Sequence, residues 1–376
     1  MSKTLPVNKR YFPSGIATGE AFCNRDHLRA QLWTHIQEGT HTVIMAPRRY
    51  GKSSLMTQVL LENHCCYGWV DFLSCANESA VQDKLLKCIA ELTERLTSGT
   101  SKLQKVLQHF FDRMRPEIIL GVAGQKVILH MDPQDAAHNI SEALMQLDAY
   151  VHSLGLRVVL VLDEFQQLAQ LPQAHALEAN IRHAVERSQA ITYLFSGSER
   201  HMLASMFGVH ERPLYRLCHV LPVERIQPQD YEPFLQEAAQ AHWGKSLDKQ
   251  AFDRLIELTS CHPFYVNALC QSLWRLPAPP SQEDVDRLWH EYVHFHKSII
   301  TSEVGRLSLN QLQALSTLAL HPTKQPYAHE FMMKVKLSQS SLKLALQALL
   351  DKDLVYQQDG QYQILDPGLR YYLANF

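Results

Sequence analysis

The feature that most constrains the fold of this chain is the alternation of short apolar runs with helix-length segments over roughly its first 225 residues. The runs that look like buried strands are Thr42–Ala46, Tyr67–Phe72, Arg157–Leu162 and Ile191–Phe195. Strands that are apolar on both faces and separated by helices are typical of a parallel sheet covered on each side by helices. The pattern therefore predicts a three-layer α/β domain.

Two inserts interrupt this rhythm. Ile118–Val122 and Val127–Leu129 predict a hairpin added to the sheet, and Asp135–Leu154 predicts a long helix before the third strand. The other helices expected in this part of the chain are Lys52–Glu62, Glu78–Leu96 and Ala174–Gln189.

Helical patterns replace the strands after Pro228. The segments are Gln229–His242, Asp248–Thr259, Pro263–Trp274 and Gln282–Ile300. They predict a small all-helical domain.

The tail from Leu307 has a third pattern. Helices are expected at Asn310–Leu320, Ala328–Val335 and Ser338–Leu350, and the Asp359-Gly360 pair between alternating residues predicts a hairpin. Three helices followed by a hairpin make a winged helix. We therefore expect domains at residues 1–226 (α/β), 227–305 (helical lid) and 306–376 (winged helix).

Composition bounds the function. The chain has 36 Lys and Arg against 38 Asp and Glu, a formal charge of −2, so no global basic footprint indicates nucleic acid. No apolar run approaches the ~18 residues of a membrane span, and the N-terminus lacks a secretory signal. We expect a cytoplasmic protein, without a membrane partner, whose 8 cysteines are reduced.

The segment Ala46-Pro-Arg-Arg-Tyr-Gly-Lys-Ser-Ser54 joins an expected strand to an expected helix, where a phosphate-binding loop belongs. Gly51 lets backbone amides turn toward phosphate, Lys52 can reach the β- and γ-phosphates, and Ser53 offers a hydroxyl to Mg²⁺. An ordinary strand–turn–helix connection is the alternative. The candidate nucleotide-binding residues of the loop are Pro47, Arg48, Arg49, Tyr50, Gly51, Lys52, Ser53 and Ser54.

Two acids follow the strand Val158–Leu162 directly. Carboxylates at the carboxyl end of a parallel strand lie where ligands bind in open α/β sheets. Asp163 is expected to hold the metal through water, and Glu164 to act as general base toward the attacking water. The alternative is that the acids merely favour a helix N-terminus opening at Phe165.

These segments together resemble the archaeal-type branch of the STAND ATPases, signalling relatives of AAA+ and origin-recognition ATPases. The resemblance rests on "APRRYGKSSL" and "VVLVLDEFQQL" and covers roughly Ala21–Leu276, extending to the winged helix. It implies that Asn24 and Arg25 lie beside the adenine and that Pro263 packs on it from the lid. It also implies a polar γ-phosphate sensor at the end of the fourth strand, here Ser196.

The sequence departs from the family pattern at three positions. Ala46 and Cys261 each stand where the family has Gly, which predicts looser or strained backbone at those points. The sensor carries Ser rather than Asn, so turnover is expected to be slow. The arginines that could neutralise the transferring phosphoryl group are Arg48, Arg49, Arg200, Arg212 and Arg216, with Arg200 the first choice because it follows the sensor strand.

Two other sequence features suggest a different function. His290-Glu291-Tyr292-Val293-His294 matches the zinc-peptidase pattern, with Glu303 as a conceivable third ligand, but two ordinary lid histidines are the better interpretation. The expected recognition helix of the winged helix carries one basic residue, Lys343, so DNA contact is open but not demanded.

The sequence thus predicts an ATP- and ADP-binding, Mg²⁺-dependent ATPase that acts as a nucleotide-controlled switch. It would relay to a separate effector protein and could form an ATP-dependent homo-oligomer. The alternative is an initiator- or loader-like ATPase that binds DNA through its winged helix. ATP against GTP stays open.

Overall fold

The computed structural model describes residues 10–97, 118–122, 125–129 and 136–376. By its internal contacts the chain divides into two compact units. The first, here called the α/β unit, is Asp26–Arg48 with Lys52–Glu224. The second, the helical unit, is Met1–Arg25, Arg49–Gly51 and Arg225–Phe376. The sequence-based division into three domains stays a prediction.

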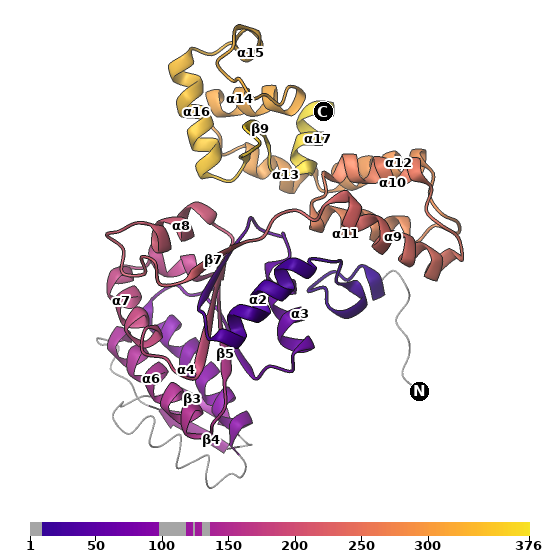
Figure 1. Ribbon diagram of the computed structural model, residues 1–376. Coiled ribbons are helices and arrows are strands. Elements are labelled where there is room, and N and C mark those ends of the chain that lie inside the picture. Colours follow the sequence, from indigo (N-terminus) through magenta and orange to yellow (C-terminus); the bar gives the residue numbers. More distant parts are fainter. Residues whose placement is uncertain (1–9, 98–117, 123–124, 130–135) are drawn as a thin grey trace. The chain divides into compact units, whose positions relative to one another are not determined.

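The α/β unit is built on a parallel sheet of five strands in the order β2-β5-β6-β1-β7 (Figure 1). The strands are β1 Thr42–Met45, β2 Tyr67–Asp71, β5 Val158–Asp163, β6 Ile191–Gly197 and β7 His219–Pro222. The four predicted strands are confirmed. The fifth, β7, was not predicted; it is a short, largely exposed strand at the edge of the sheet, and it ends in Pro222.

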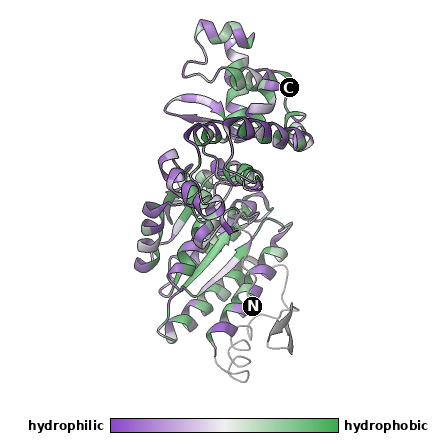
Figure 2. Cartoon of the chain, turned by 90° about the vertical axis from the view of Figure 1, so that its right-hand side faces the viewer, coloured by the Kyte–Doolittle hydropathy of each residue, from purple (hydrophilic) through white to green (hydrophobic). Residues whose placement is uncertain are grey.

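Helices lie on both sides of this sheet, as the three-layer prediction requires. α2 (Asp26–Glu38) and α3 (Lys52–Glu62) lie on one side, and α4 (Glu78–Leu96), α6 (Ala136–Ser153) and α7 (Ala174–Val185) on the other (Figure 1). The hydrophobic strands appear between them in green in Figure 2, and every residue of β5 and β6 is buried. Burial of these strands supplies the main hydrophobic stabilisation of the unit.

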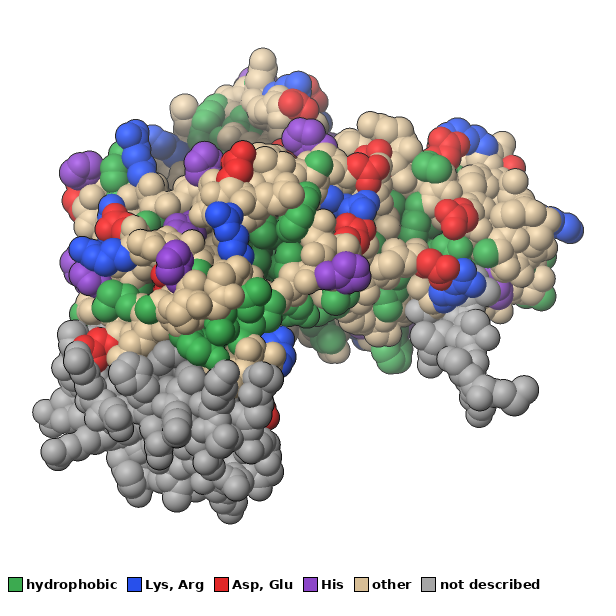
Figure 3. All heavy atoms as spheres, turned by 60° about the horizontal axis from the view of Figure 1, so that its bottom comes forward, with side chains coloured by type: hydrophobic (Ala, Val, Ile, Leu, Met, Phe, Trp, Pro, Cys, Tyr) green, Lys and Arg blue, Asp and Glu red, His purple; other side chains and the backbone are tan. Residues whose placement is uncertain are grey.

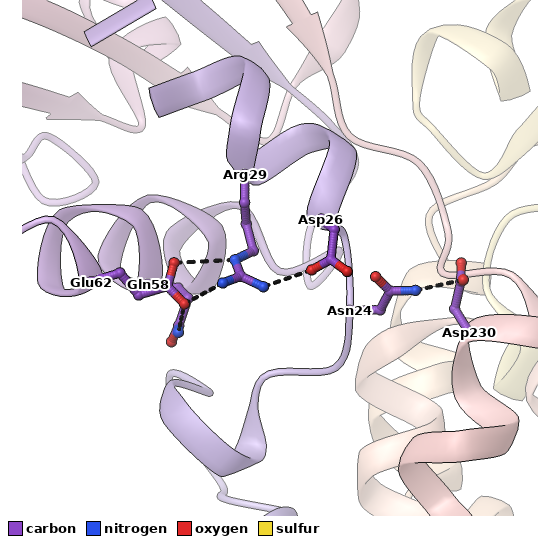
Figure 4. Close-up of polar contacts among 6 residues, drawn as sticks. All are labelled: Asn24, Asp26, Arg29, Gln58, Glu62 and Asp230. Carbon is purple, nitrogen blue, oxygen red and sulfur yellow. Dashed lines mark hydrogen bonds and ion pairs between the residues drawn. The ribbon is translucent and has the colours of Figure 1, made fainter. Parts of the chain in front are cut away.

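An arginine joins the two helices on the first side. Arg29 of α2 forms an ion pair with Glu62 at the end of α3, and its Nη1 donates to Asp26 at 2.7 Å (Figure 4). Gln58 donates to the same Glu62 carboxylate at 2.5 Å. These contacts join the first turn of α2 to the last turn of α3, the helix that begins at Lys52.

The predicted hairpin forms but not where the sequence suggested. β3 (Ile118–Val122) and β4 (Gln125–Leu129) pair antiparallel and make a separate two-stranded sheet. The expectation that they extend the main sheet is wrong: the two strands hydrogen-bond to each other, and β3 packs against α4.

The helical unit begins with five helices: α9 Pro228–Trp243, α10 Lys249–Thr259, α11 Pro263–Leu273, α12 Gln282–Phe295 and α13 Lys297–Val304. The last expected helix is thus two, because the chain turns at His296. Tyr11 and Phe12 from the N-terminal segment are buried in the same core, where the Phe12 and Trp274 rings lie 4.7 Å apart.

The unit ends in three helices, a hairpin and one more helix. These are α14 Leu309–Leu320, α15 His329–Val335, α16 Gln339–Asp351, β8 Val355–Gln358, β9 Gln361–Ile364 and α17 Pro367–Asn375. Ser338 caps α16 by accepting from the amide of Ser341, as predicted. α17 was not expected. Asp366 caps it and also accepts from the Tyr265 hydroxyl at 2.7 Å, so α17 is tied to α11.

Candidate nucleotide-binding site

The loop between β1 and α3 has the backbone of a phosphate-binding loop. Gly51 has φ 84°, and α3 begins at the next residue, Lys52. A side chain is strained at such a φ, so glycine suits the position. The backbone amides at the start of α3, together with the helix dipole, favour an anion at this end of the helix.

The substitution of Ala46 for glycine carries no backbone strain. Ala46 does not have a positive φ, whereas Arg49 does, at 64°. Cys261, the other glycine replacement, does adopt the left-handed region with φ 57°, and so does Ser260 with φ 48°. The strain expected from the sequence is therefore present at Cys261 and absent at Ala46.

Lys52 is buried at the first turn of α3. Its Nζ donates to the carbonyl oxygens of Ala46 at 3.0 Å and Pro47 at 3.2 Å. The ammonium is therefore held inside the loop, on the side where the loop's own carbonyls converge. A polyphosphate in the loop would meet this charge directly.

Asp163, at the end of β5, accepts hydrogen bonds from three neighbouring segments. The Ser53 hydroxyl of α3 donates to Oδ2 at 3.3 Å, the Ser196 hydroxyl of β6 donates to Oδ1, and the backbone amide of Glu164 donates to Oδ1 at 3.0 Å. Burial raises the pKa of Asp163, and the Ser196 hydrogen bond opposes that shift.

The sheet register explains this convergence. β6 lies between β5 and β1, with Phe195 opposite Leu162 and Ser196 opposite Ile44. The carboxyl ends of the three strands therefore meet at one edge of the sheet. Asp71, at the end of β2, is the register partner of Asp163 and adds an exposed carboxylate to this edge.

Glu164 adopts a left-handed conformation, with φ 51° and ψ 39°. Its Oε2 accepts from Gln166 Nε2 at 2.6 Å and from the Ser198 hydroxyl at 2.9 Å. Its side chain makes no capping hydrogen bond to the short helix η3 (Phe165–Gln170) that follows. A short helix does open at Phe165, as the alternative expected, but the Glu164 side chain is held by Gln166 and Ser198 and does not cap it.

Two of these partners were not among the predicted site residues. Gln166 follows Glu164 by two positions, and Ser198 follows Ser196 by two. Ser196 itself, the expected sensor, is fully buried with its hydroxyl on Asp163. Only their closeness to the two motifs would have pointed to Gln166 and Ser198.

The candidate arginines occupy different surroundings. Arg48 donates from Nε to the Ser198 hydroxyl oxygen at 3.2 Å, and Arg200 is the first residue of α8 (Arg200–Gly208). Arg212 is paired with the buried Glu178, whose pKa burial raises. Arg216 lies over the Tyr215 ring. In the helical unit, Arg49 lies over the Phe264 ring at 4.2 Å. Arg48 is thus joined to the Glu164 network through Ser198.

The residues that the resemblance assigns to the adenine lie in the helical unit. Asn24 and Arg25 both have positive φ; the Asn24 amide donates to Asp230 at 2.5 Å (Figure 4), and Arg25 donates to the Tyr50 carbonyl at 2.7 Å. Pro263 is the first residue of α11. Their contact with a base stays a prediction.

Arg225 connects three parts of the helical unit. It donates to the Tyr50 hydroxyl at 2.9 Å, to the Ser260 carbonyl at 2.8 Å and to the Leu365 carbonyl at 2.7 Å. Its guanidinium also lies over the Tyr356 ring of β8 at 5.0 Å. The Arg225 side chain thus hydrogen-bonds to Tyr50, to the residue after α10 and to the residue after β9.

The zinc alternative gains no support. His290 and His294 lie on α12, and His290 stacks on the Phe376 ring, with 5.2 Å between ring centroids. Glu291 pairs with Arg287. The Glu303 side chain lies outside the described residues. Among those described, no group of three or more His, Cys, Asp or Glu side chains could hold a metal ion.

Comparison with known proteins agrees with this architecture. Residues 301–375 match the family model described as "probable winged helix domain". None of the curated proteins is similar to this sequence. In the described parts of the chain, every helix is too short or too polar to cross a membrane.

Solved structures match over nearly the whole chain. The Walker-type ATPase PABY2304 of Pyrococcus abyssi has 18% identity and a TM-score of 0.70, with 97% of this chain and 99% of that one covered. The ORC2 protein of Aeropyrum pernix in ADPNP–ADP complexes has 14% identity and a TM-score of 0.58, with 97% and 95% covered. The ORC1 protein of the same organism in complex with DNA has 11% identity and a TM-score of 0.50, with 98% and 96% covered.

At these identities the likeness shows the fold. The chain has the fold of archaeal Walker-type and origin-recognition ATPases, a P-loop α/β core followed by a winged helix. The predicted fold class is confirmed.

Proposed function

We propose that this chain binds ATP and ADP at the loop Ala46–Ser54 and hydrolyses ATP with the help of Mg²⁺. The observation that carries the proposal is the convergence on Asp163 of hydroxyls from α3 and β6, beside a glutamate held by two donors. The P-loop ATPase fold supports it. An ordinary structural turn does not require this set of groups.

The residues present suit a magnesium ion. Ser53 and Asp163 offer the hard oxygen ligands that Mg²⁺ prefers, and a site with few protein ligands leaves room for its waters and for phosphate oxygens. When bound, the ion would neutralise charge on the phosphates. Lys52 and the amides at the start of α3 would bind the phosphate oxygens themselves.

Glu164 has the role of general base in this proposal. It would accept a proton from the attacking water, and Ser196 would keep Asp163 oriented. Arg200 and Arg48 remain the candidates for the phosphoryl group within the α/β unit. A base of this kind contributes typically 10²- to 10⁴-fold to the rate.

The test is ATP turnover in Glu164→Gln. This variant keeps the size of the side chain and removes the base, so kcat should fall about 100-fold or more while ATP is still bound. Phosphate release measured at saturating Mg·ATP gives kcat. Unchanged turnover in a Glu164→Gln preparation would rule out this role for the acid.

A second function is favoured by the winged helix. We propose that it contacts DNA, as in an initiator- or loader-like ATPase. The similar ORC1 protein was solved in complex with DNA, and Lys334, Lys336 and Lys343 are exposed on or beside α15 and α16. On the face shown in Figure 3, basic and acidic side chains are interspersed.

Duplex binding measured against salt concentration tests this second function. Because phosphate contacts release counterions, affinity should fall steeply with salt, and Lys343→Ala should weaken it and lower the salt slope by about 1. Lys249→Ala is the control, since Lys249 is an exposed lysine of α10 outside the winged helix. No binding at low salt would eliminate the DNA function.

Relay to a separate effector protein, an ATP-dependent homo-oligomer and a cytoplasmic location stay predictions. The origin-recognition fold favours the DNA-binding alternative over the effector relay. The nucleotide that co-purifies with the protein would decide between ATP and GTP.

A further inference from the structure

Both donors to Glu164 bind the same carboxylate oxygen. Gln166 Nε2 lies 2.6 Å and the Ser198 hydroxyl 2.9 Å from Oε2. The donors come from different segments, η3 and the residue that follows β6. Within the described parts of the chain, no hydrogen bond reaches Oε1. Oε2 is therefore held in place by two donors, and Oε1 can accept a hydrogen bond from a bound water.

The Gln166 side chain has no freedom to move away. It is fully buried, and a Cβ added at Gly197 would lie 1.9 Å from its Oε1 and 2.9 Å from its Cδ. The amide thus occupies space that only a glycine in β6 leaves open. Turning the amide over would bring its oxygen against the carboxylate, so the NH₂ group must face Glu164.

Burying the Gln166 amide leaves one of its polar atoms without a hydrogen bond in the described part of the chain, which costs free energy. Gln166 Oε1 is buried and has no hydrogen-bond partner among the described residues. Buried polar atoms are rarely left so, and an exception calls for an explanation. A glutamine retained there for packing alone would be better replaced by an apolar side chain of the same size.

The direction of the Ser198 hydrogen bond is set by the phosphate loop. Arg48 Nε donates to the hydroxyl oxygen at 3.2 Å, and an arginine has no acceptor. The single hydroxyl proton of Ser198 is therefore left for Glu164 Oε2. In this way the loop residue Arg48 is linked through Ser198 to the acid.

We propose that Gln166 and Ser198 are positioning residues for Glu164, fixing its carboxylate through Oε2 so that Oε1 accepts the proton of the attacking water. This rests on the proposed ATPase function. A general base must lie within hydrogen-bond reach of the proton that it takes, and a small misplacement costs much of the rate. The two donors keep Glu164 in that position.

The test compares Gln166→Met and Ser198→Ala with the wild-type chain at saturating Mg·ATP. Methionine keeps the length of the side chain and removes the donor. We expect kcat to fall about 10- to 100-fold in Gln166→Met, while KM and the affinity for a fluorescent ATP analogue stay within about twofold. Ser198→Thr, which keeps a hydroxyl, should retain more turnover than Ser198→Ala.

The decisive readout uses the Glu164→Gln background. If Gln166 acts through the acid, Gln166→Met lowers kcat in the wild-type chain but has no further effect when Glu164 is already replaced. Gln167→Met is the control: Gln167 is the adjacent, half-exposed residue, and it should keep wild-type turnover.

Three outcomes would overturn the proposal. Equal losses from Gln166→Met in both backgrounds would mean a general structural effect. If kcat falls in Glu164→Gln but stays at the wild-type value in both Gln166→Met and Ser198→Ala, the positioning role is overturned and the role of Glu164 as base is not. A wild-type chain without turnover would overturn the ATPase function and this role with it. Should Gln166→Met fail to fold, Ser198→Ala and Ser198→Thr carry the same comparison.

Discussion

His262 is a buried histidine held between two aromatic rings. Its ring centroid lies 4.9 Å from that of Tyr50 and 5.1 Å from that of Tyr265. Burial, together with the nearby charges of Arg225 and Arg49, lowers the pKa of His262 to about 3. The folded chain therefore keeps this ring neutral at any pH at which the protein would work.

This perturbation predicts a pH dependence of stability. In the unfolded chain the histidine titrates near its ordinary pKa of about 6.5. As the pH falls from that value toward 3, the unfolded state binds a proton that the folded state does not, so stability is lost. The free energy of unfolding of the wild type should fall relative to that of His262→Phe by up to about 1.4 kcal/mol per pH unit.

Urea unfolding of both proteins between pH 7 and pH 4 measures this difference. Other titrating groups act in both chains, so they cancel in the comparison. Parallel curves would show that His262 is not held neutral.

At the residue scale, the sequence indicated the parts of the site that carry a motif. Ser53 donates to Asp163, and the charge of Lys52 opposes the rise that burial causes in the pKa of Asp163. Gln166 and Ser198 could not be identified in this way, because no sequence motif or periodic pattern marks a single buried amide or hydroxyl side chain. Their contact with Glu164 depends on the tertiary fold, which places η3 and the residue after β6 beside that acid.

At the scale of elements, long strands buried on both faces were predictable, and the short exposed edge strand was not. β5 and β6 are buried on both faces and are visible as apolar runs. β7 is an exposed edge strand, and α17 is a nine-residue helix whose buried residues are few. The pairing of β3 with β4 follows from local sequence, but whether a hairpin joins a larger sheet depends on distant residues.

One contact between elements yields a stability prediction. The Tyr265 hydroxyl of α11 donates to both oxygens of Asp366, the cap of α17, at 2.7 Å. Tyr265→Phe should lower the free energy of unfolding by about 1.5–3 kcal/mol, because the hydrogen bond of the buried Tyr265 hydroxyl to a half-buried carboxylate is lost. The hydrogen bond of Asp366 to the Leu369 amide would remain.

Urea unfolding followed by tryptophan fluorescence measures the loss. Tyr372→Phe is the matched control, since Tyr372 is half-buried in the same unit and stacks on Phe376. Equal midpoints for the Tyr265→Phe and Tyr372→Phe chains would show that the Asp366 contact contributes nothing.

At the scale of the whole molecule, the chain combines a P-loop core with a winged helix. Within the helical unit Arg225 ties Tyr50 of the phosphate loop to the lid and the winged helix. The change from alternating strands and helices to helices alone after Pro228 was predictable from the patterns along the chain, whereas the division into three domains stays a prediction. That the N-terminal segment belongs to the helical unit could not be predicted, because the residues that Tyr11 and Phe12 pack against are far away in the sequence.

The central claim is that the loop Ala46–Ser54 binds a nucleoside triphosphate. Calorimetric titration of the wild-type chain and of Lys52→Ala with Mg·ATP tests it most directly, with Lys249→Ala as the control. We predict saturable binding by the wild type and the control, and a loss of about 10- to 100-fold in Lys52→Ala because the charged contact to phosphate is removed. A wild-type chain that binds no nucleoside triphosphate, or a Lys52→Ala chain that binds as tightly as the wild type, would contradict the account.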